Sequence, residues 1–155
     1  MSPKRSGASD AVLVASRALV GVAARSLAET EDTVTLVQYR ALVLLAARGE
    51  LNVSGLADAL EVHQTTATRL CDRLVARGLV DRGQSPQNRR EVVVSLTRDG
   101  WALIRSVTIR RRAELDRIMG RLSAKQRAAV NEAFALFAEA AREAPDDAWR
   151  LGWTT

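Results

Sequence analysis

The sequence has very few of the residues on which disulfide, metal and catalytic sites depend. Its 155 residues include one cysteine and one histidine, and a single cysteine excludes an internal disulfide and fits a reducing cytoplasm. His63 and Cys71 lie eight positions apart, which is roughly 12 Å of rise on a helix and too far for a catalytic dyad or a shared metal ion. The sequence also has no Gly-rich phosphate loop and no nucleophile elbow. We therefore expect no enzyme, no metal site and no cofactor.

Proline and aromatic residues are scarce as well. There are three prolines, and Phe, Trp and Tyr together make up 4% of the chain, whereas apolar residues make up 47%. This composition favours a compact, mostly helical protein over a disordered one. The length suits one domain with its own core, and no internal break suggests a second. We therefore predict a single domain over residues 1–155.

An apolar run near the N-terminus raises the question of export. Lys4 and Arg5 precede the run AVLVASRALVGVAA, a pattern that a signal peptide would share. Asp10 before the run and Arg17 within it argue against both export and membrane insertion. We interpret the run as the first helix of a cytoplasmic protein that does not bind a membrane.

Positive charge is concentrated in one part of the chain. The net charge of +5 and the pI near 10.5 are only weak signs of a polyanionic partner. Residues 63–90 contain six arginines and two aspartates, a net charge of +4, whereas residues 1–62 contain six basic and seven acidic side chains. The basicity is therefore local. A second basic cluster, Arg110-Arg111-Arg112, is interpreted as a solvated helix face.

The most informative stretch is 54–82, which predicts two short helices joined by a tight turn. Ser54 is the expected cap of the first helix, and the turn Glu61-Val62-His63 leads to the second, which Gly78 ends. Cys71 is interpreted as a packed hydrophobe rather than a redox sensor. The other face of the second helix has hydroxyls and guanidiniums, the groups that reach phosphates and base edges. Its apolar stripe consists of Ala67, Leu70, Cys71, Leu74 and Val75.

The flanking segments predict a hairpin and further helices. Two β-like segments, 79–83 and 91–97, surround a basic loop and predict a projecting hairpin. Capping boxes at Thr35–Gln38 and Ser123–Gln126 predict helix starts, as does Thr97. Residues 51–53 are interpreted as a short extended piece, and Pro145 is expected to end the last helix.

This order of elements resembles the MarR family of winged helix-turn-helix regulators. The resemblance extends over about Val12 to Ala141. It is strongest in two motifs, TATRLCDRLVARGLVDR at 66–82 and NRREVVVSLTRDG at 88–100. It implies a mainly α fold with a small β-hairpin, the wing, in a homodimer that binds pseudo-palindromic double-stranded DNA. Such proteins are usually repressors released by a small molecule or by oxidation. We expect dimerisation helices at 10–30 and 104–145, on either side of a DNA-binding lobe at 33–103.

The second helix of the pair is the expected recognition helix. The N-terminal half of a helix in the major groove lies closest to base edges. Gln64 is therefore expected to read adenine and Arg69 to pair bidentately with guanine, while Arg73, a turn later, is better placed for a phosphate. Three threonines are expected to bond to bases or phosphates, or to place a methyl against thymine: Thr65, Thr66 and Thr68.

The wing has its own expected role. A minor groove narrowed at A·T-rich steps concentrates negative potential, and a guanidinium on a thin loop can enter it. Arg90 matches the family's wing arginine, and Arg89 is the more natural phosphate contact. Asn88, the third expected DNA-binding residue of the wing, stands where the family usually has Asp. A charge that helps to brace the wing in the family is therefore absent, which leaves the order of the wing open.

The helix pair also departs from the family pattern. Glu61 stands where the turn often has Gly, and a non-Gly residue with φ > 0 is disfavoured, so we expect the turn to differ locally. His63 replaces the usual Ser or Thr cap. Asp72 matches an acidic position of the family. We expect it to orient a nearby arginine, for which the wing is one possible location, rather than to read DNA.

Other functions and an effector remain open at this point. The rivals are a sequence-tolerant architectural DNA-binding protein and a helical ligand- or protein-binding module that has lost DNA binding. The resemblance implies a small-molecule effector, such as a phenolic compound, held between the dimer helices and the DNA-binding lobe. That location puts four residues in range, none of which we assign to a site: Tyr39, Val43, Trp101 and Arg105. Trp149 and Trp153 are expected to pack on a neighbouring helix or on the partner subunit.

Overall fold

The computed structural model describes residues 7–28 and 34–143 and confirms the predicted fold class. It is mainly helical, with six helices and a small three-stranded antiparallel sheet in the described part of the chain. In chain order the elements are α1 (Gly7–Ala28), α2 (Leu36–Arg48), β1 (Leu51–Asn52), α3 (Val53–Leu60), α4 (Gln64–Ala76), β2 (Val80–Gln84), β3 (Val92–Leu96), α5 (Arg98–Met119) and α6 (Ala124–Ala140).

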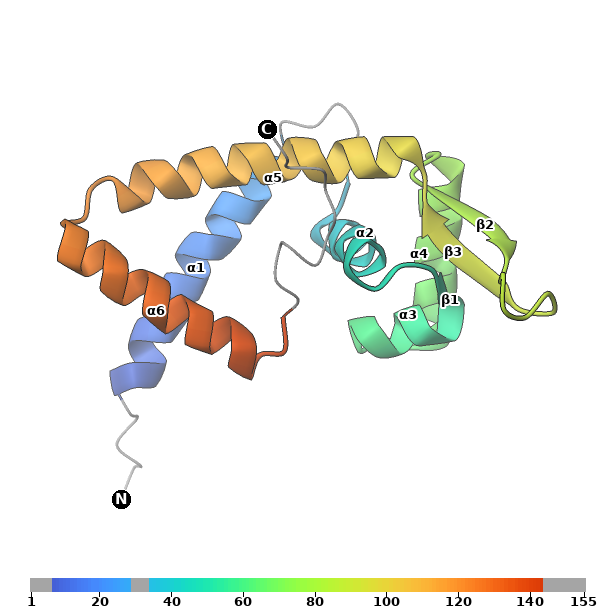
Figure 1. The fold of residues 1–155 in the computed structure, drawn as a ribbon, viewed down its shortest axis with the longest axis horizontal. Coiled ribbons are helices and arrows are strands. Elements are labelled where there is room, and N and C mark those ends of the chain that lie inside the picture. The colour runs from blue at the N-terminus through green and yellow to red at the C-terminus, as the bar shows by residue number, and fades with distance from the viewer. Residues whose placement is uncertain (1–6, 29–33, 144–155) are drawn as a thin grey trace, which may run out of the picture.

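The long helix α5 connects two parts of the molecule (Figure 1). At its N-terminal end lie α2, α3, α4 and the sheet, and towards its C-terminal end lie α1 and α6. The helix α6 contributes no buried residue. The only part of the described chain with a continuous apolar interior is therefore the part that contains α4 and the hairpin, together with the adjoining stretch of α5.

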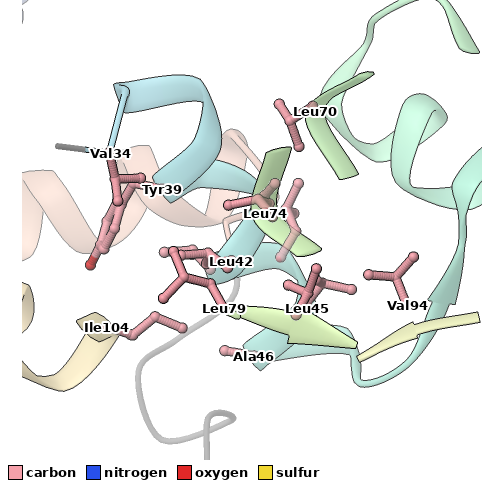
Figure 2. Packing of buried hydrophobic residues seen from close by; sticks show 14 of the residues in the cluster. Val34, Tyr39, Leu42, Leu45, Ala46, Leu70, Leu74, Leu79, Val94 and Ile104 are labelled. Atoms are coloured by element: carbon pink, nitrogen blue, oxygen red, sulfur yellow. The ribbon is translucent and has the colours of Figure 1, made fainter. Parts of the chain in front are cut away.

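The core of this lobe is built by residues from every surrounding element. Its fully buried side chains include Leu42 and Leu45 from α2, Leu74 from α4, Val94 from β3 and Ile104 from α5 (Figure 2). Burying a side chain of this size contributes roughly 1.5–3 kcal/mol. Because α4 buries its apolar stripe in this core, its opposite face is turned to solvent.

The short extended piece predicted at 51–53 is a strand at 51–52, and it pairs with the hairpin, which the sequence did not indicate. The order of the sheet is β1-β3-β2, so the hairpin β2–β3 is extended by the two-residue strand β1. Leu51 lies opposite Val94 and Asn52 opposite Val93, while Arg82 of β2 lies opposite Val94 on the other side. The pairing of 51–52 could not be foreseen because it joins residues about forty positions apart, with no local turn to fix the register.

Helix starts agree with the sequence at four positions, three of them with a side-chain cap, and disagree at one. The capping boxes at Thr35–Gln38 and Ser123–Gln126 are both present, and Thr97 caps α5. The prediction that Ser54 caps α3 is wrong. The helix begins one residue earlier, at Val53, and Asn52 Oδ1 accepts the Gly55 N–H at 2.6 Å. Asn is at least as good a cap as Ser, and Asn52 is already extended because it belongs to β1. The second helix of the pair starts at Gln64 after His63, as expected.

The turn between α3 and α4 keeps its left-handed residue without glycine. Glu61 has φ 55° and ψ 42°, so the expectation that the turn would differ locally is wrong. The turn is held by the Glu61 N–H, which donates to Asp58 O at 3.1 Å, and by the Val62 N–H, which donates to Ala57 O at 3.0 Å. These bonds offset a conformational cost of roughly 1 kcal/mol.

The last helix ends before the expected proline. The helix α6 stops at Ala140, and Arg142 takes a left-handed conformation with φ 55°. The Glu143 N–H then donates to Ala138 O at 3.0 Å, which closes the helix end as a Schellman-type motif does. Three residues that the sequence singled out lie outside the described residues: Pro145, Trp149 and Trp153.

Candidate nucleic-acid interface

The recognition helix expected from the sequence exposes its polar face along its whole length. Its apolar stripe is buried, with Ala67, Cys71 and Leu74 at 0% exposure. All six residues proposed to face DNA from this helix are exposed: Gln64, Thr65, Thr66, Thr68, Arg69 and Arg73. The structure therefore brings them together on one surface, next to the hairpin (Figure 1).

The threonines of this face are not equivalent. The Thr68 hydroxyl donates to the Gln64 carbonyl oxygen one turn earlier, at 2.9 Å. Its proton is therefore engaged, and towards a ligand Thr68 offers an acceptor oxygen and a methyl group. No side chain caps α4, because His63 makes no side-chain cap hydrogen bond.

An ion pair joins the recognition helix to the first strand of the wing. Arg82 Nη2 on β2 lies 2.5 Å from Asp72 Oδ1 on α4, which confirms that Asp72 pairs with a nearby arginine and shows that this arginine belongs to the hairpin. Both side chains are substantially exposed, so the pair is worth no more than about 1 kcal/mol. Its consequence is geometric, because it fixes β2 against α4.

Cys71 lies beneath this pair and is fully buried. Burial raises the pKa of its thiol, and the nearby Arg82 opposes that rise only in part. A thiol whose pKa is raised is a poor nucleophile at neutral pH. Packing is therefore the role that the structure supports for Cys71.

The wing tip is built by its own hydrogen bonds. Ser85 is buried, and its Oγ accepts the N–H groups of Gln87 at 3.3 Å and Asn88 at 3.4 Å. Asn88 Oδ1 in turn accepts the Arg90 N–H at 3.2 Å. Where the family has its aspartate, the amide oxygen of Asn88 accepts a backbone N–H in the manner of an Asx-turn. Arg89 and Arg90 are both exposed on this loop.

The second basic cluster is less solvated than the sequence indicated. Arg110 donates to Ser106 Oγ at 2.8 Å and to the Ser26 carbonyl oxygen at 3.3 Å. The guanidinium of Arg111 lies over the Tyr39 ring, 5.1 Å from its centroid, and its Nε and Nη2 are buried with no hydrogen-bond partner among the described residues. Of the three arginines, only Arg112 is exposed. Periodicity could not reveal this, because α1 and α2 cover that face of α5 only in the folded chain.

Arg111 and Tyr39 line a hollow of about 440 Å³ between α1, α2, α5 and α6. Of the four positions that the sequence placed in range of an effector, Tyr39 alone lines it. Val43 is buried in the core, Trp101 packs at its edge, and Arg105 is exposed.

Three comparisons with known proteins bear on this arrangement. Residues 34–92 match the model of the MarR family. The chain is 32% identical over 110 residues to the helix-turn-helix-type transcriptional regulator YfiV of Bacillus subtilis, a match that covers 71% of this chain and 69% of YfiV. The crystal structure of RV1404 from Mycobacterium tuberculosis is 36% identical, with a TM-score of 0.86 over 94% of this chain and 99% of that one.

The chain belongs to the MarR family. It is therefore a DNA-binding transcriptional regulator and not an enzyme. A further relative, the transcriptional repressor NicR of Pseudomonas putida, is 34% identical over 100 residues, which are 64% of this chain and 63% of NicR. MarR regulators bind DNA as homodimers. The exposed face of α4 and the wing are therefore present twice in the assembly that binds DNA.

Proposed function

We propose that this MarR-family protein is a repressor that binds a pseudo-palindromic operator as a homodimer and responds to a small organic anion. The main support for the proposal is that one lobe contains both an exposed polar recognition helix and a hydrogen-bonded basic wing. The relative NicR is named as a repressor, which favours repression. The site of action is then the cytoplasm, where bacterial DNA lies.

Dimerisation is supported by the distribution of exposed apolar side chains. Of the thirteen large hydrophobic residues that are exposed in the described chain, ten lie on α1, α5 and α6. The stretch Asp10–Ala28 is by length and composition apolar enough to cross a membrane. It packs along α5, and Arg25 pairs with Glu114 at 2.5 Å. A second copy covering these helices accounts for the apolar surface and places two recognition helices about one DNA turn, roughly 34 Å, apart.

Arg69→Ala is expected to cost about 1–3 kcal/mol of operator binding and to relax discrimination at one base position in each half-site. The reason is that Arg69 lies in the N-terminal half of α4, exposed and without an ion pair to the described residues. The measurement is affinity for an operator series with single base changes. If the variant kept the affinity and the base preference of the parent protein, Arg69 would not be a residue that reads a base.

Arg89→Ala is the matched control for that experiment, since it removes an equally exposed guanidinium from the wing. It is expected to weaken binding uniformly across sequences and to reduce the slope of the salt dependence by about one for each phosphate that is no longer neutralised. A change in base preference at Arg89 would reverse the two assignments.

The proposed function as a whole is tested without knowing the operator. Random duplexes are selected on the purified protein at moderate salt, sequenced, and footprinted. A defined protected palindrome supports the proposal, and binding without sequence preference would favour an architectural protein. Absence of binding would favour a module that no longer binds DNA.

The effector part of the proposal depends on Arg111. The Nε–H and Nη2–H of an arginine form one edge that matches a carboxylate in a bidentate pair. Arg111, Tyr39 and Phe134 line the hollow, and the Nε and Nη2 atoms of Arg111 are buried with no hydrogen-bond partner among the described residues. A rotation of the guanidinium would turn this edge towards the hollow. Leaving such donors unsatisfied costs about 1–3 kcal/mol each, so a planar organic anion fits this edge.

Arg111→Gln is expected to weaken binding of a benzoate-type probe by about tenfold or more, because a charge-assisted bidentate pair is worth about 1.5–3 kcal/mol. Calorimetry with salicylate as the probe measures this directly. Arg105→Gln, which changes an exposed arginine outside the hollow, serves as the control and should bind like the parent protein. Equal salicylate affinity in both variants would mean that Arg111 does not hold the anion.

A further inference from the structure

A side-chain bond ties the wing to the helix pair at the point where the tip loop joins β3. Asn52, the last residue of β1 and the cap of α3, donates through Nδ2 to Oε1 of Glu91, which directly precedes β3. The other end of the same amide is engaged as well, because Asn52 Oδ1 accepts the Gly55 N–H at 2.6 Å. The two partners together fix the orientation of the amide: the oxygen must face the N–H and the nitrogen must face the carboxylate.

Glu91 is the residue through which the wing tip joins the sheet. Its backbone N–H donates to Asn88 O at 2.9 Å, and its carbonyl oxygen accepts the Ser85 N–H at 2.9 Å. These two bonds close the loop that carries Arg89 and Arg90. The side chain of Glu91 leaves this loop and is half-buried where it meets Asn52. A displacement of Glu91 therefore displaces both arginines.

The wing is thus held on both of its strands. On one side Arg82 of β2 pairs with Asp72 of α4, and on the other Glu91 at the start of β3 bonds to Asn52 at the start of α3. Each strand is linked to a different helix of the helix-turn-helix unit. The position usually occupied by the family's wing aspartate is Asn88 here, and within the described part of the chain Asn88 bonds only to residues of the wing tip. Among the described residues, Glu91 is the carboxylate of the wing itself whose side chain bonds to the rest of the lobe.

We infer that Glu91 is a positioning residue for DNA recognition: its bond to Asn52 sets the angle at which the wing arginines meet the minor groove relative to the recognition helix. The inference rests on the proposed function, since it concerns the wing's contact with DNA. The local order of the wing, however, is a property of the protein alone and is measured without DNA.

Four variants test the bond between Asn52 and Glu91. Asn52→Asp keeps the acceptor that caps α3, because Asp is as good a cap as Asn, but replaces the donor with a carboxylate that faces Glu91. Glu91→Gln keeps an acceptor oxygen for Asn52 and is the conservative control. The double variant Asn52→Asp/Glu91→Gln restores the bond in the opposite direction, since the glutamine amide can donate to the aspartate. Glu91→Ala removes the bond without touching the cap.

Two readouts separate positioning from general stability. Hydrogen exchange of the wing amides in the free protein is expected to accelerate about tenfold in Asn52→Asp and Glu91→Ala, to stay near the parent rate in Glu91→Gln, and to recover in the double variant. On a selected operator the first two variants are expected to lose hydroxyl-radical protection of the minor groove, with about tenfold weaker binding, while guanine N7 protection in the major groove remains.

The outcomes are distinguishable from those that test the function itself. If the parent protein selects no defined sequence, the proposed function fails, and the exchange data still decide whether Glu91 braces the wing. Parent-like exchange and minor-groove protection in Asn52→Asp and Glu91→Ala would overturn the inference. So would a double variant that fails to recover. If Asn52→Asp does not fold, Glu91→Ala, which leaves the α3 cap intact, provides the same comparison.

Discussion

Phe137→Asp is expected to convert the protein to a monomer and to weaken operator binding by about a hundredfold to ten-thousandfold. Phe137 lies on α6 with 54% of its surface exposed in the single chain. With Phe134 it borders an apolar crevice between α6 and α1 that also includes Val12 and Leu19. A carboxylate placed in the proposed interface would be desolvated without a partner, and two-fold symmetry introduces it twice. A monomer then loses the gain of binding two half-sites at once, about 10²–10⁴.

Light scattering at micromolar concentration and a gel shift on a two-half-site operator measure these effects. Phe137→Leu, which keeps an apolar side chain of similar size, is the control and should remain dimeric. Because α6 contributes no buried residue to the single chain, the DNA-binding lobe should keep its helical circular dichroism in the aspartate variant. A dimer of normal operator affinity would show that the interface lies elsewhere.

Gly100→Ala is expected to destabilise the lobe by about 3 kcal/mol, although Gly to Ala in a helix is normally stabilising by roughly 1 kcal/mol. A Cβ at Gly100 would lie 2.2 Å from the Leu79 carbonyl oxygen and 3.1 Å from Leu96 Cδ2. That oxygen cannot withdraw freely, because it accepts the Thr97 N–H at 3.2 Å. Thr97 also donates to Gly78 O at 2.6 Å and accepts the Gly100 N–H at 3.0 Å. The first turn of α5 is therefore seated directly on the backbone between α4 and β2.

Thermal unfolding measures this prediction, with the midpoint falling by roughly 6–12 °C for a protein of this size. Gly83→Ala on β2 is the matched control, because a Cβ there would meet no atom within 4 Å. It should leave the midpoint within a few degrees of the parent. A Gly100 variant as stable as the control would mean that α5 can move away from Leu79 at little cost.

Much of the fold was predictable because it is encoded by local patterns. The apolar stripe of α4, the two capping boxes and Gly78 each act within one or two turns of helix, and each is found where the sequence predicts it. The mainly helical class and the family follow from the same local features in a fixed order. Even the pairing of Asp72 with a wing arginine is predictable, although only the tertiary structure shows that the arginine is Arg82.

The errors have a common physical cause. Ser54 is an adequate cap, but Asn52 is preferred because β1 pairs with β3 and holds Asn52 extended. Glu61 was expected to disturb the turn, but the bonds around it hold the left-handed conformation. Arg111 was predicted to be solvated, but its guanidinium lies over the Tyr39 ring of α2 with Nε and Nη2 buried. In each case a contact distant in sequence or made by the backbone outweighs a local preference.

The sequence by itself determined the class of fold, the helix that presents a polar face to DNA, and the basic wing beside it. These depend on side-chain periodicity and charge along short segments, which act before the chain folds up. Tertiary structure alone decided how the wing is held, through Asn52 and Glu91, and which arginine of α5 is withdrawn from water, because both require elements far apart in the chain to meet. Burial makes such contacts decisive: a hydrogen bond or a charge withdrawn from water has a larger effect on the free energy than the same group on an exposed helix.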